Sequence, residues 1–163
     1  AYMYHADQSE MWLGEALKDG YRARVRIADK MPVWYVRHPS DFDRLLDTQL
    51  ERLQQDHIDF YLLHSLDGAN WRRVLEHDQL RAAERALSDG RIGHLGFSFH
   101  GSHEEFAEIV AATDLWEFCQ IQLNYMDEQF QAGRRGLEMA AARDLGVIVM
   151  EPIRGGTGQM NWA

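Results

Sequence analysis

The sequence predicts an α/β fold, a (β/α)8 TIM barrel that is incomplete here, with about five parallel strands and intervening helices. Three strand-like runs end in a polar residue, at Lys30, His64 and Ser98, and each step between these residues is 34 residues long. About 30 residues is the length of one strand–helix–strand unit. A doubly wound open sheet is the alternative, but it often carries a Gly-x-Gly-x-x-Gly turn after its first strand, and the chain has none. The barrel is therefore favoured.

The first quarter of the chain predicts a helix, a strand and the start of a second helix. Asp7 and Glu10 resemble a capping box, and apolar residues follow at helical spacing up to Gly20. A strand is expected over residues 24–30. Ser40 then precedes two aspartates suited to a first helical turn, and the following leucines form the apolar stripe of that helix.

The middle of the chain repeats this pattern. A strand is expected over residues 58–64, followed by helical material that begins at a cap on Asn70 and reaches about Leu87. Gly90 is a natural helix stop. The next strand is expected over residues 92–98.

The last third of the chain continues the alternation. Ser102 and Glu105 have the spacing of a capping box. A strand over residues 118–123, a helix over 130–145 and a strand over 147–150 follow. Such alternation implies parallel strands that are buried on both faces.

The number of strands predicts a partial domain. A complete barrel has eight strands and roughly 250 residues. Residues 1–163 are therefore expected to form part of a TIM-barrel domain that lacks the first strands and the C-terminal part of the barrel.

The composition is that of a soluble globular protein, with 45% hydrophobic residues. A net charge of −9 argues against a nucleic-acid partner and against an anionic membrane surface. No apolar run approaches the roughly 20 residues of a transmembrane helix, and no signal peptide is visible, so the chain is expected to be cytoplasmic. The sequence does not indicate an oligomeric state.

No metal site is expected. Cys119 is the only cysteine, which excludes an internal disulfide and a multi-cysteine site. His100 and His103 lie near a strand end, but the run after His103 lacks the second histidine of His-Glu-x-x-His.

The polar strand ends predict an active-site floor. Functional side chains of (β/α)8 barrels stand at the C-terminal ends of successive strands, which is where Lys30, His64 and Ser98 are expected. Trp34 and Tyr35 follow Lys30 in a loop at the same end, as part of a substrate pocket or as a loop anchor.

Several motifs of the chain resemble those of the aldo-keto reductases, and they occur in the family order. Ala28-Asp29-Lys30-Met31-Pro32 is similar to the family's Ala-Thr-Lys-x-Pro, and residues 90–98 are similar to its Gly-Lys-Ile-Arg-x-Ile-Gly-x-Ser. The other matching stretches are residues 1–4, 9–10, 13–17, 50–53 and 56–64.

Residues 120–125 and 150–156 are most similar to a bacterial and archaeal branch of the family. Its full-length members often carry a C-terminal iron–sulfur extension. An iron–sulfur cluster is therefore expected only in such an extension and not within these residues.

The resemblance implies three catalytic residues, Tyr4, Lys30 and His64. Tyr4 matches the general acid, and an adjacent ammonium lowers the pKa of a tyrosine, which is about 10 when unperturbed. Lys30 matches the lysine that has this effect. His64 is suited to orienting a carbonyl or sharing in proton transfer.

The resemblance also implies a nicotinamide site. Ser98 and Gln120 match residues that bind the carboxamide, and Asn124 shapes the same pocket. Met150 stands where many members have a stacking tyrosine. Gly155 and Gly156 fall where the backbone approaches the pyrophosphate.

The function implied is that of an NAD(P)H-dependent oxidoreductase that reduces an aldehyde or ketone to an alcohol, with NADP(H) expected over NAD(H). Residues 1–163 alone are expected to be inactive. The alternative is a non-catalytic cofactor-binding or electron-transfer subunit on the same fold, because Phe99 and Met150 replace the asparagine and tyrosine common beside the nicotinamide. A metal-dependent barrel hydrolase is a third class.

Overall fold

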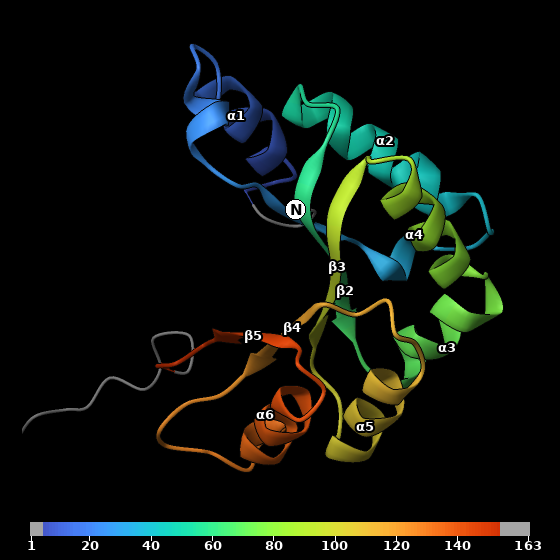
Figure 1. The fold of residues 1–163 in the computed structure, drawn as a ribbon, viewed down its shortest axis with the longest axis vertical. Coiled ribbons are helices and arrows are strands. Elements are labelled where there is room, and N and C mark those ends of the chain that lie inside the picture. The colour runs from blue at the N-terminus through green and yellow to red at the C-terminus, as the bar shows by residue number, and fades with distance from the viewer. Residues whose placement is uncertain (1–4, 154–163) are drawn as a thin grey trace, which may run out of the picture.

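The computed structural model describes residues 5–153 and shows one sheet of five parallel strands (Figure 1). Their order in the sheet is their order in the sequence. The strands are β1 (Ala28–Met31), β2 (Ile58–Leu66), β3 (Ile92–Phe99), β4 (Phe118–Gln122) and β5 (Gly146–Met150). A doubly wound sheet requires a reversal of strand order. The unbroken order is that of a barrel, so the predicted fold class is confirmed.

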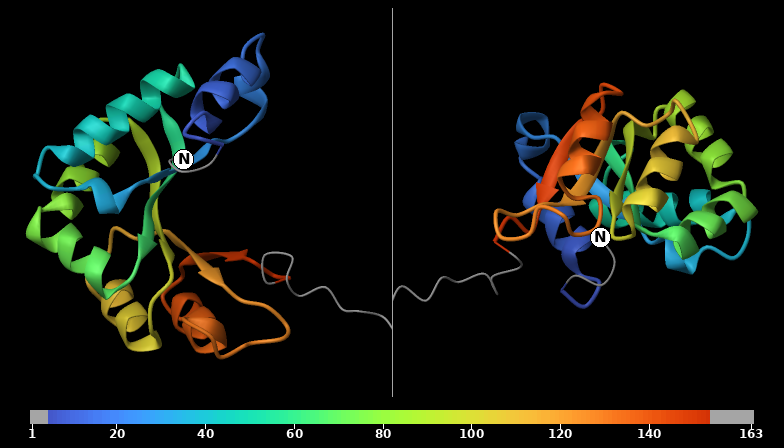
Figure 2. Two further views of the ribbon diagram at one scale, coloured as in Figure 1. Left: turned by 180° about the vertical axis from the view of Figure 1, so that it is seen from behind. Right: turned by 90° about the horizontal axis from the view of Figure 1, so that it is seen from below.

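Helices α2 to α6 form an arc on the outside of this curved sheet (Figure 2). The helices are α1 (Ser9–Ala16), α2 (Asp41–Leu53), α3 (Gly68–Glu76), α4 (Gln79–Ser88), α5 (His103–Ala111) and α6 (Gly133–Ala141). Two short 3-10 helices are η1 (Tyr21–Arg24) and η2 (Val33–Tyr35). Within residues 5–153, none of these helices has the length and apolar character needed to cross a membrane.

The helix expected between Asn70 and Leu87 is in fact two helices, and its cap lies earlier than predicted. The Asp67 carboxylate accepts the Asn70 N–H at 2.7 Å, so Asp67 is the cap of α3. Asp78 has a left-handed backbone, with φ of 51°, and separates α3 from α4.

The N-terminal segment also differs from its prediction. Gln8 precedes α1 and makes no side-chain capping bond, so the expected Asp7–Glu10 box does not form. Instead, Glu10 is buried. The 3-10 turn η1 occupies residues up to Arg24, and β1 therefore begins at Ala28. The capping box of Ser102 and Glu105, in contrast, is present as predicted at the start of α5.

The core lies between the sheet and the helices and is rich in aromatic side chains. Phe99 and Phe97 of β3 both pack against Phe106 of α5, with ring centroids 5.1 and 5.8 Å apart. Tyr61 of β2 contacts Phe42 of α2 at 5.8 Å. All five side chains are fully buried. This layer fixes which face of each strand is turned toward the helices.

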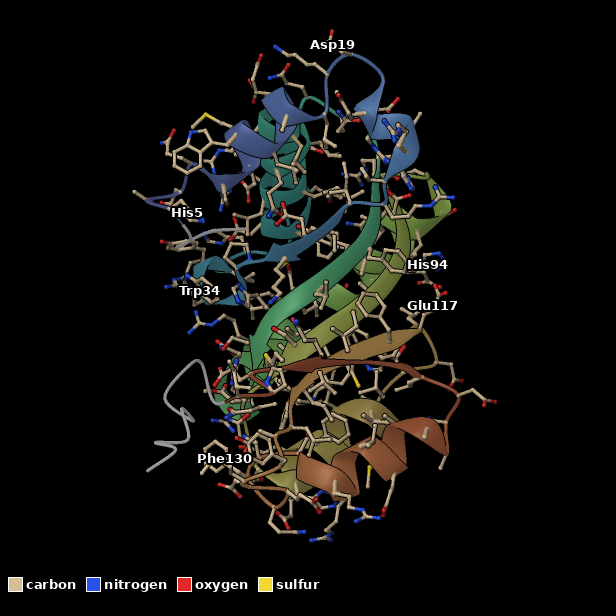
Figure 3. All side chains as sticks on the ribbon, turned by 90° about the vertical axis from the view of Figure 1, so that its left-hand side faces the viewer. His5, Asp19, Trp34, His94, Glu117 and Phe130 are labelled. Carbon is tan, nitrogen blue, oxygen red and sulfur yellow. The ribbon has the colours of Figure 1, made fainter. Side chains whose placement is uncertain are left out.

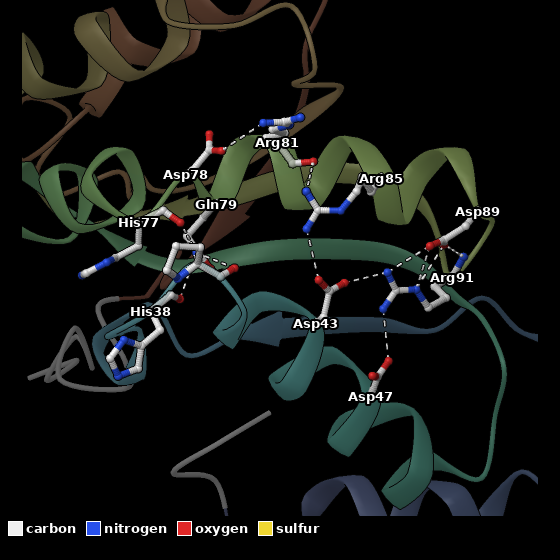
Figure 4. A network of polar contacts seen from close by, with 11 residues as sticks. His38, Asp43, Asp47, His77, Asp78, Gln79, Arg81, Arg85, Asp89 and Arg91 are labelled. Carbon is white, nitrogen blue, oxygen red and sulfur yellow. Dashed lines mark hydrogen bonds and ion pairs between the residues drawn. The ribbon is translucent and has the colours of Figure 1, made fainter.

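An ion-pair network on the outer surface ties α2 to α4 and to the turn before β3 (Figure 4). Arg91 contacts Asp43 at 2.7 Å, Asp47 at 3.1 Å and Asp89 at 2.9 Å. Arg85 of α4 binds the same Asp43 at 3.1 Å. The network holds the start of β3 in place.

The two edge strands have one neighbour each in the part of the chain that the structure describes. On β5, Ile148 is 44% exposed and Val149 is 42% exposed, although they point to opposite faces. An apolar edge strand of this kind is usually paired or covered in a stable protein.

Candidate active site

The strand register gathers the predicted site residues on one face of the sheet. Lys30 pairs with Leu62, Leu62 pairs with Gly96, and Ser98 pairs with Gln120. Paired residues share a face, and so do residues two apart on one strand. Lys30, Ser98 and Gln120 therefore stand on the same face of neighbouring strands.

This face is the inner one, turned away from the helices. Tyr61 and Phe97 alternate with the site residues along β2 and β3, and both pack against outer helices. Lys30 and Ser98 are each one residue before the end of their strand. The polar cluster thus lies inside the curve of the sheet, at the C-terminal ends of the strands, as the sequence predicted.

His64 joins this cluster beside Ser98. It lies two residues after Leu62 and is followed by an irregularity in β2, where Ser65 has a φ of 57°. The Ser65 N–H donates to the Ser98 hydroxyl oxygen at 2.8 Å, which links the ends of β2 and β3. The Trp34 ring, from the loop after β1, lies 5.0 Å from the His64 ring. Trp34 therefore forms a wall of the cluster.

The electrostatics of Lys30 and His64 are coupled. Burial lowers the pKa of His64 most, the positive charges of Lys30 and His100 add to this effect, and the resulting pKa is about 4. Burial also lowers the pKa of Lys30, while the charge of Asp29 opposes this effect. His64 is consequently neutral near pH 7 and available as a hydrogen-bonding group.

Aromatic side chains lie against one another on the inner face below the polar cluster. Phe60 stacks on His94 at 4.9 Å and meets the edge of Phe118 at 5.5 Å. Phe118 covers Gly96 so closely that a methyl group there would lie 2.7 Å from its ring. Figure 3 shows Trp34 at one end of the strands and His94 at the other. The polar end therefore rests on a packed floor.

Two buried polar atoms near the cluster have the donor and acceptor character that a carboxamide requires. Gln120 Oε1 and Asn124 Nδ2 are buried and have no hydrogen-bond partner within residues 5–153. Asn124 Oδ1 accepts the N–H groups of Met126 and Asp127 at 3.1 and 3.0 Å, which fixes the side chain. Buried polar groups are almost always paired. One free acceptor and one free donor match the NH2 and C=O of a nicotinamide carboxamide.

The remaining predicted residues are Met150 and three residues that the structure does not describe. Met150 ends β5, pairs with Gln122 and is half-buried. Tyr4, Gly155 and Gly156 lie outside the described residues.

Phe99 contributes nothing to the inner face. It is fully buried on the helix side, against Phe106 of α5. A residue at this position faces away from Ser98, its neighbour on the strand. Phe99 therefore contributes a core contact and no contact to the inner face.

Of the two histidines after β3, His100 lies in the loop and His103 is the first residue of α5. His100 Nδ1 lies 3.4 Å from the amide nitrogen of Gln131. Within residues 5–153, no group of three histidine, cysteine, aspartate or glutamate side chains could hold a metal ion.

The sequence reasoning missed a buried polar group behind Lys30. Asp29, Glu10 and Gln49 are all buried and join β1 to α1 and α2. The sequence signal that could have indicated this group is Asp29, a charged residue within a short strand.

One cavity of the described chain lies away from the cluster. It has a volume of about 530 Å3 and lies between the loop after β4, α6 and β5. Asn124 is the predicted site residue that lines this cavity, and Leu137 and Val149 line its apolar side. The cavity is open to solvent because it lies beside the exposed edge strand β5.

Solved structures share this fold. A thermostable aldo-keto reductase, solved with the inhibitor epalrestat, matches with a TM-score of 0.76 at 24% identity, over 93% of this chain and 53% of that one. The holo form of an aldo-keto reductase from Bacillus halodurans matches with a TM-score of 0.69 at 23% identity, over 90% of this chain and 47% of that one. This likeness shows the fold, that of a (β/α)8 barrel.

The sequence comparisons give the family. A model described as the aldo/keto reductase family matches residues 1–160, and the chain belongs to this family. Among curated proteins, the human aflatoxin B1 aldehyde reductase member 2 is 32% identical over 108 residues, which are 64% of this chain and 29% of that protein. The chain thus spans about half the length of the solved relatives and less of the curated one.

Proposed function

We propose that the protein is an NAD(P)H-dependent reductase that converts an aldehyde or ketone to an alcohol. The observation that carries this proposal is the shared inner face of Lys30, Ser98 and Gln120, with His64 beside them, in a member of the aldo/keto reductase family. A bound nicotinamide cofactor supplies the hydride that the carbonyl carbon accepts. The chain must then supply the proton for the carbonyl oxygen.

Tyr4 is the proposed proton donor. An unperturbed phenol has a pKa of about 10, and an ammonium nearby favours the phenolate and lowers this value. Lys30 provides that charge. His64 is neutral because burial lowers its pKa to about 4, so it can hydrogen-bond the substrate oxygen without competing as a cation. The phenol proton goes to the oxygen as the hydride reaches the carbon, which gives the alcohol.

The cofactor site is proposed to use the inner face of β3, β4 and β5. Ser98, Gln120 and Asn124 would hold the carboxamide and so select the ring face that donates the hydride. Met150 would contact the ring, and the glycines at 155 and 156 would lie along the pyrophosphate. NADP(H) is proposed in preference to NAD(H), and the protein is proposed to act in the cytoplasm on small molecules.

Residues 1–163 are proposed to be part of a barrel domain. The exposed edge strand β5 supports this, because a closed barrel has no free edges. On this proposal the isolated segment is inactive, and activity belongs to the complete protein.

The second candidate function is a cofactor-binding or electron-transfer subunit without useful turnover. It is favoured by Phe99, which is packed in the core and cannot contact the carboxamide, and by Met150 in place of a stacking tyrosine. Retention of Lys30 and His64 in one cluster favours the enzyme.

The deciding experiment is NADPH consumption by the complete protein with a panel of aldehydes, ketones and quinones. Tyr4→Phe should reduce turnover by about 10²–10⁴-fold and leave NADPH affinity nearly unchanged, because only the proton donor is lost. Tyr21→Phe is the matched control, since Tyr21 is 54% exposed and lies in η1. Tight NADPH binding without turnover in the unmodified protein would establish the second candidate, and activity retained in Tyr4→Phe would disprove the acid assignment.

A further inference from the structure

A buried polar cluster lies behind Lys30, on the side of β1 that faces α1 and α2. Its members are Asp29, Glu10 and Gln49, with exposed fractions of 4%, 2% and 0%. Charged residues are rarely buried to this extent unless they are paired or hydrogen-bonded. The proposed reaction does not use any of the three directly.

Side chains of this cluster hold both backbone polar groups of Lys30. The Lys30 N–H donates to Asp29 Oδ1 at 2.8 Å. Gln49 Nε2 donates to the Lys30 carbonyl oxygen at 2.9 Å and to Asp29 Oδ2 at 3.0 Å. The hydroxyl of Tyr61 donates to Gln49 Oε1, which fixes the amide with its nitrogen toward the carboxylates. The position of the lysine on its short strand thus depends on Asp29 and Gln49.

The charges around Asp29 come from three elements. Glu10 of α1 accepts from the same amide nitrogen of Gln49 at 3.0 Å and has its own counter-charge, Arg52 of α2, at 3.1 Å. On β1, the charge of Asp29 acts on Lys30 and raises its pKa. Burial, and after it the like charge of Glu10, raise the pKa of Asp29, and the resulting value is about 6. Asp29 is therefore ionised at neutral pH, where its charge supports the ammonium.

We propose that Asp29 is a positioning residue for Lys30: its buried carboxylate, clamped by Gln49, holds the lysine backbone in place and keeps the side chain protonated in the working enzyme. This inference rests on the proposed function. It also follows from a departure in this chain, because the motif that Ala28-Asp29-Lys30 resembles has threonine at the second position. Threonine can form hydrogen bonds but carries no charge.

The test compares Asp29→Asn and Asp29→Thr with the unmodified complete protein. The first readout is the pH dependence of kcat/KM for NADPH-dependent carbonyl reduction. Without the Asp29 carboxylate, no negative charge opposes the effect of burial, and the pKa of Lys30 falls. The alkaline limb of the profile should therefore move to lower pH by about 0.5–1 unit. Asp114→Asn is the control, because the Asp114 side chain is fully exposed and remote from the cluster.

The second readout is independent of turnover. Residues 1–163 contain two lysines, Lys18 and Lys30. Their amine titrations can be followed by NMR of protein labelled with ¹⁵N-lysine. Asp29→Asn should lower the pKa of Lys30. The Lys18 signal is told apart from it because Lys18 is 49% exposed and paired with Glu15.

An unchanged Lys30 titration together with an unchanged alkaline limb in a folded variant would overturn the inference. So would an equal loss of activity at every pH, which is the result of a merely structural role. If Asp29→Asn does not fold because its new amide donor faces the donor of Gln49, Asp29→Thr gives the same two measurements. A protein without turnover would contradict the proposed function alone, since the lysine titration still decides the role of Asp29.

Discussion

Asp59 is the residue whose replacement gives the largest predicted loss of stability. It is 4% exposed, and its carboxylate joins β2 to the segment before β1. Asp59 Oδ2 accepts the Ile27 N–H at 2.9 Å and Arg22 Nη2 at 2.8 Å, and Oδ1 accepts Arg26 Nη1 at 3.0 Å. The sheet register at β1 therefore depends on one buried carboxylate.

The magnitude follows from the exposure of the partners. Hydrogen bonds to charged groups contribute about 1.5–3 kcal/mol when buried, whereas an exposed ion pair contributes about 0–1 kcal/mol. The Arg22 side chain is 25% exposed and the Arg26 side chain 79%, so Ile27 and Arg22 carry most of the effect. Asp59→Asn keeps one side-chain oxygen as an acceptor, but its NH2 group is a donor that faces the N–H donors of the neighbouring residues. We expect a loss of about 2–4 kcal/mol in the free energy of unfolding.

The assay is urea denaturation of the complete protein, followed by tryptophan fluorescence. Arg26→Ala is the matched control and should lose less than about 1 kcal/mol. A loss in Asp59→Asn no larger than that of the control would refute the reasoning, because it would mean that the buried carboxylate does not hold the strand.

The pH dependence of this effect has a defined sign. Burial acts to raise the pKa of Asp59, but the hydrogen bonds from Ile27 and Arg26 and the charge of Arg22 hold it below its ordinary value of 3.8. A carboxyl with a depressed pKa in the folded state stabilises the protein above its unfolded pKa and loses this contribution as pH falls through the folded one. The difference between the protein and Asp59→Asn should therefore shrink below about pH 4.

Three further predictions concern the aromatic side chains of the inner face, the ion-pair network of the outer surface, and His64. Gly96→Ala should destabilise the protein by about 1–3 kcal/mol in the same denaturation assay, because the new methyl group would meet both the ring and the backbone of Phe118. Arg91→Ala should cost about 1–2 kcal/mol at low salt and less at high salt, because it removes the ion pairs to Asp43 and its neighbours. The pKa of His64 measured by NMR should be about 4. The protein should lose stability as pH falls from about 6.5 toward 4, because His64 of the unfolded chain then binds a proton that the folded chain does not.

Each of these predictions has its own control. Phe118→Leu should restore part of the stability lost in Gly96→Ala, and the absence of any restoration would show that the two residues do not collide. Arg81→Ala should have little effect, since its pair with Asp78 is 4.0 Å long and exposed; an equal loss in both arginine variants would contradict the network. A His64 titration near its ordinary value would mean that neither burial nor Lys30 acts on it.

The local sequence determined the strands and the order of elements. The steps between Lys30, His64 and Ser98, together with apolar runs, were sufficient to predict five parallel strands and the strand ends at which these residues stand. These features depend on periodicity and on residues near one another in the chain, which a sequence displays directly. The Ser102–Glu105 box was predicted for the same reason.

The errors arose where long-range contacts decided the outcome. Glu10 is a strong candidate for a helix cap by its spacing from Asp7, but Gln49 and Arg52 of α2 bind it instead, 39 and 42 residues away. Asp67 replaced Asn70 as a cap because the helix began earlier than its apolar pattern suggested.

The sequence by itself determined that this chain is a parallel α/β barrel domain with a lysine, a histidine and a serine at successive strand ends. Only the tertiary structure decided the electrostatic state of that site. The pKa of His64 is depressed because the site is buried and Lys30 lies close by, and Asp29 is clamped by Gln49 from another element. Burial and distance between residues far apart in the chain set these energies, and a linear sequence contains neither.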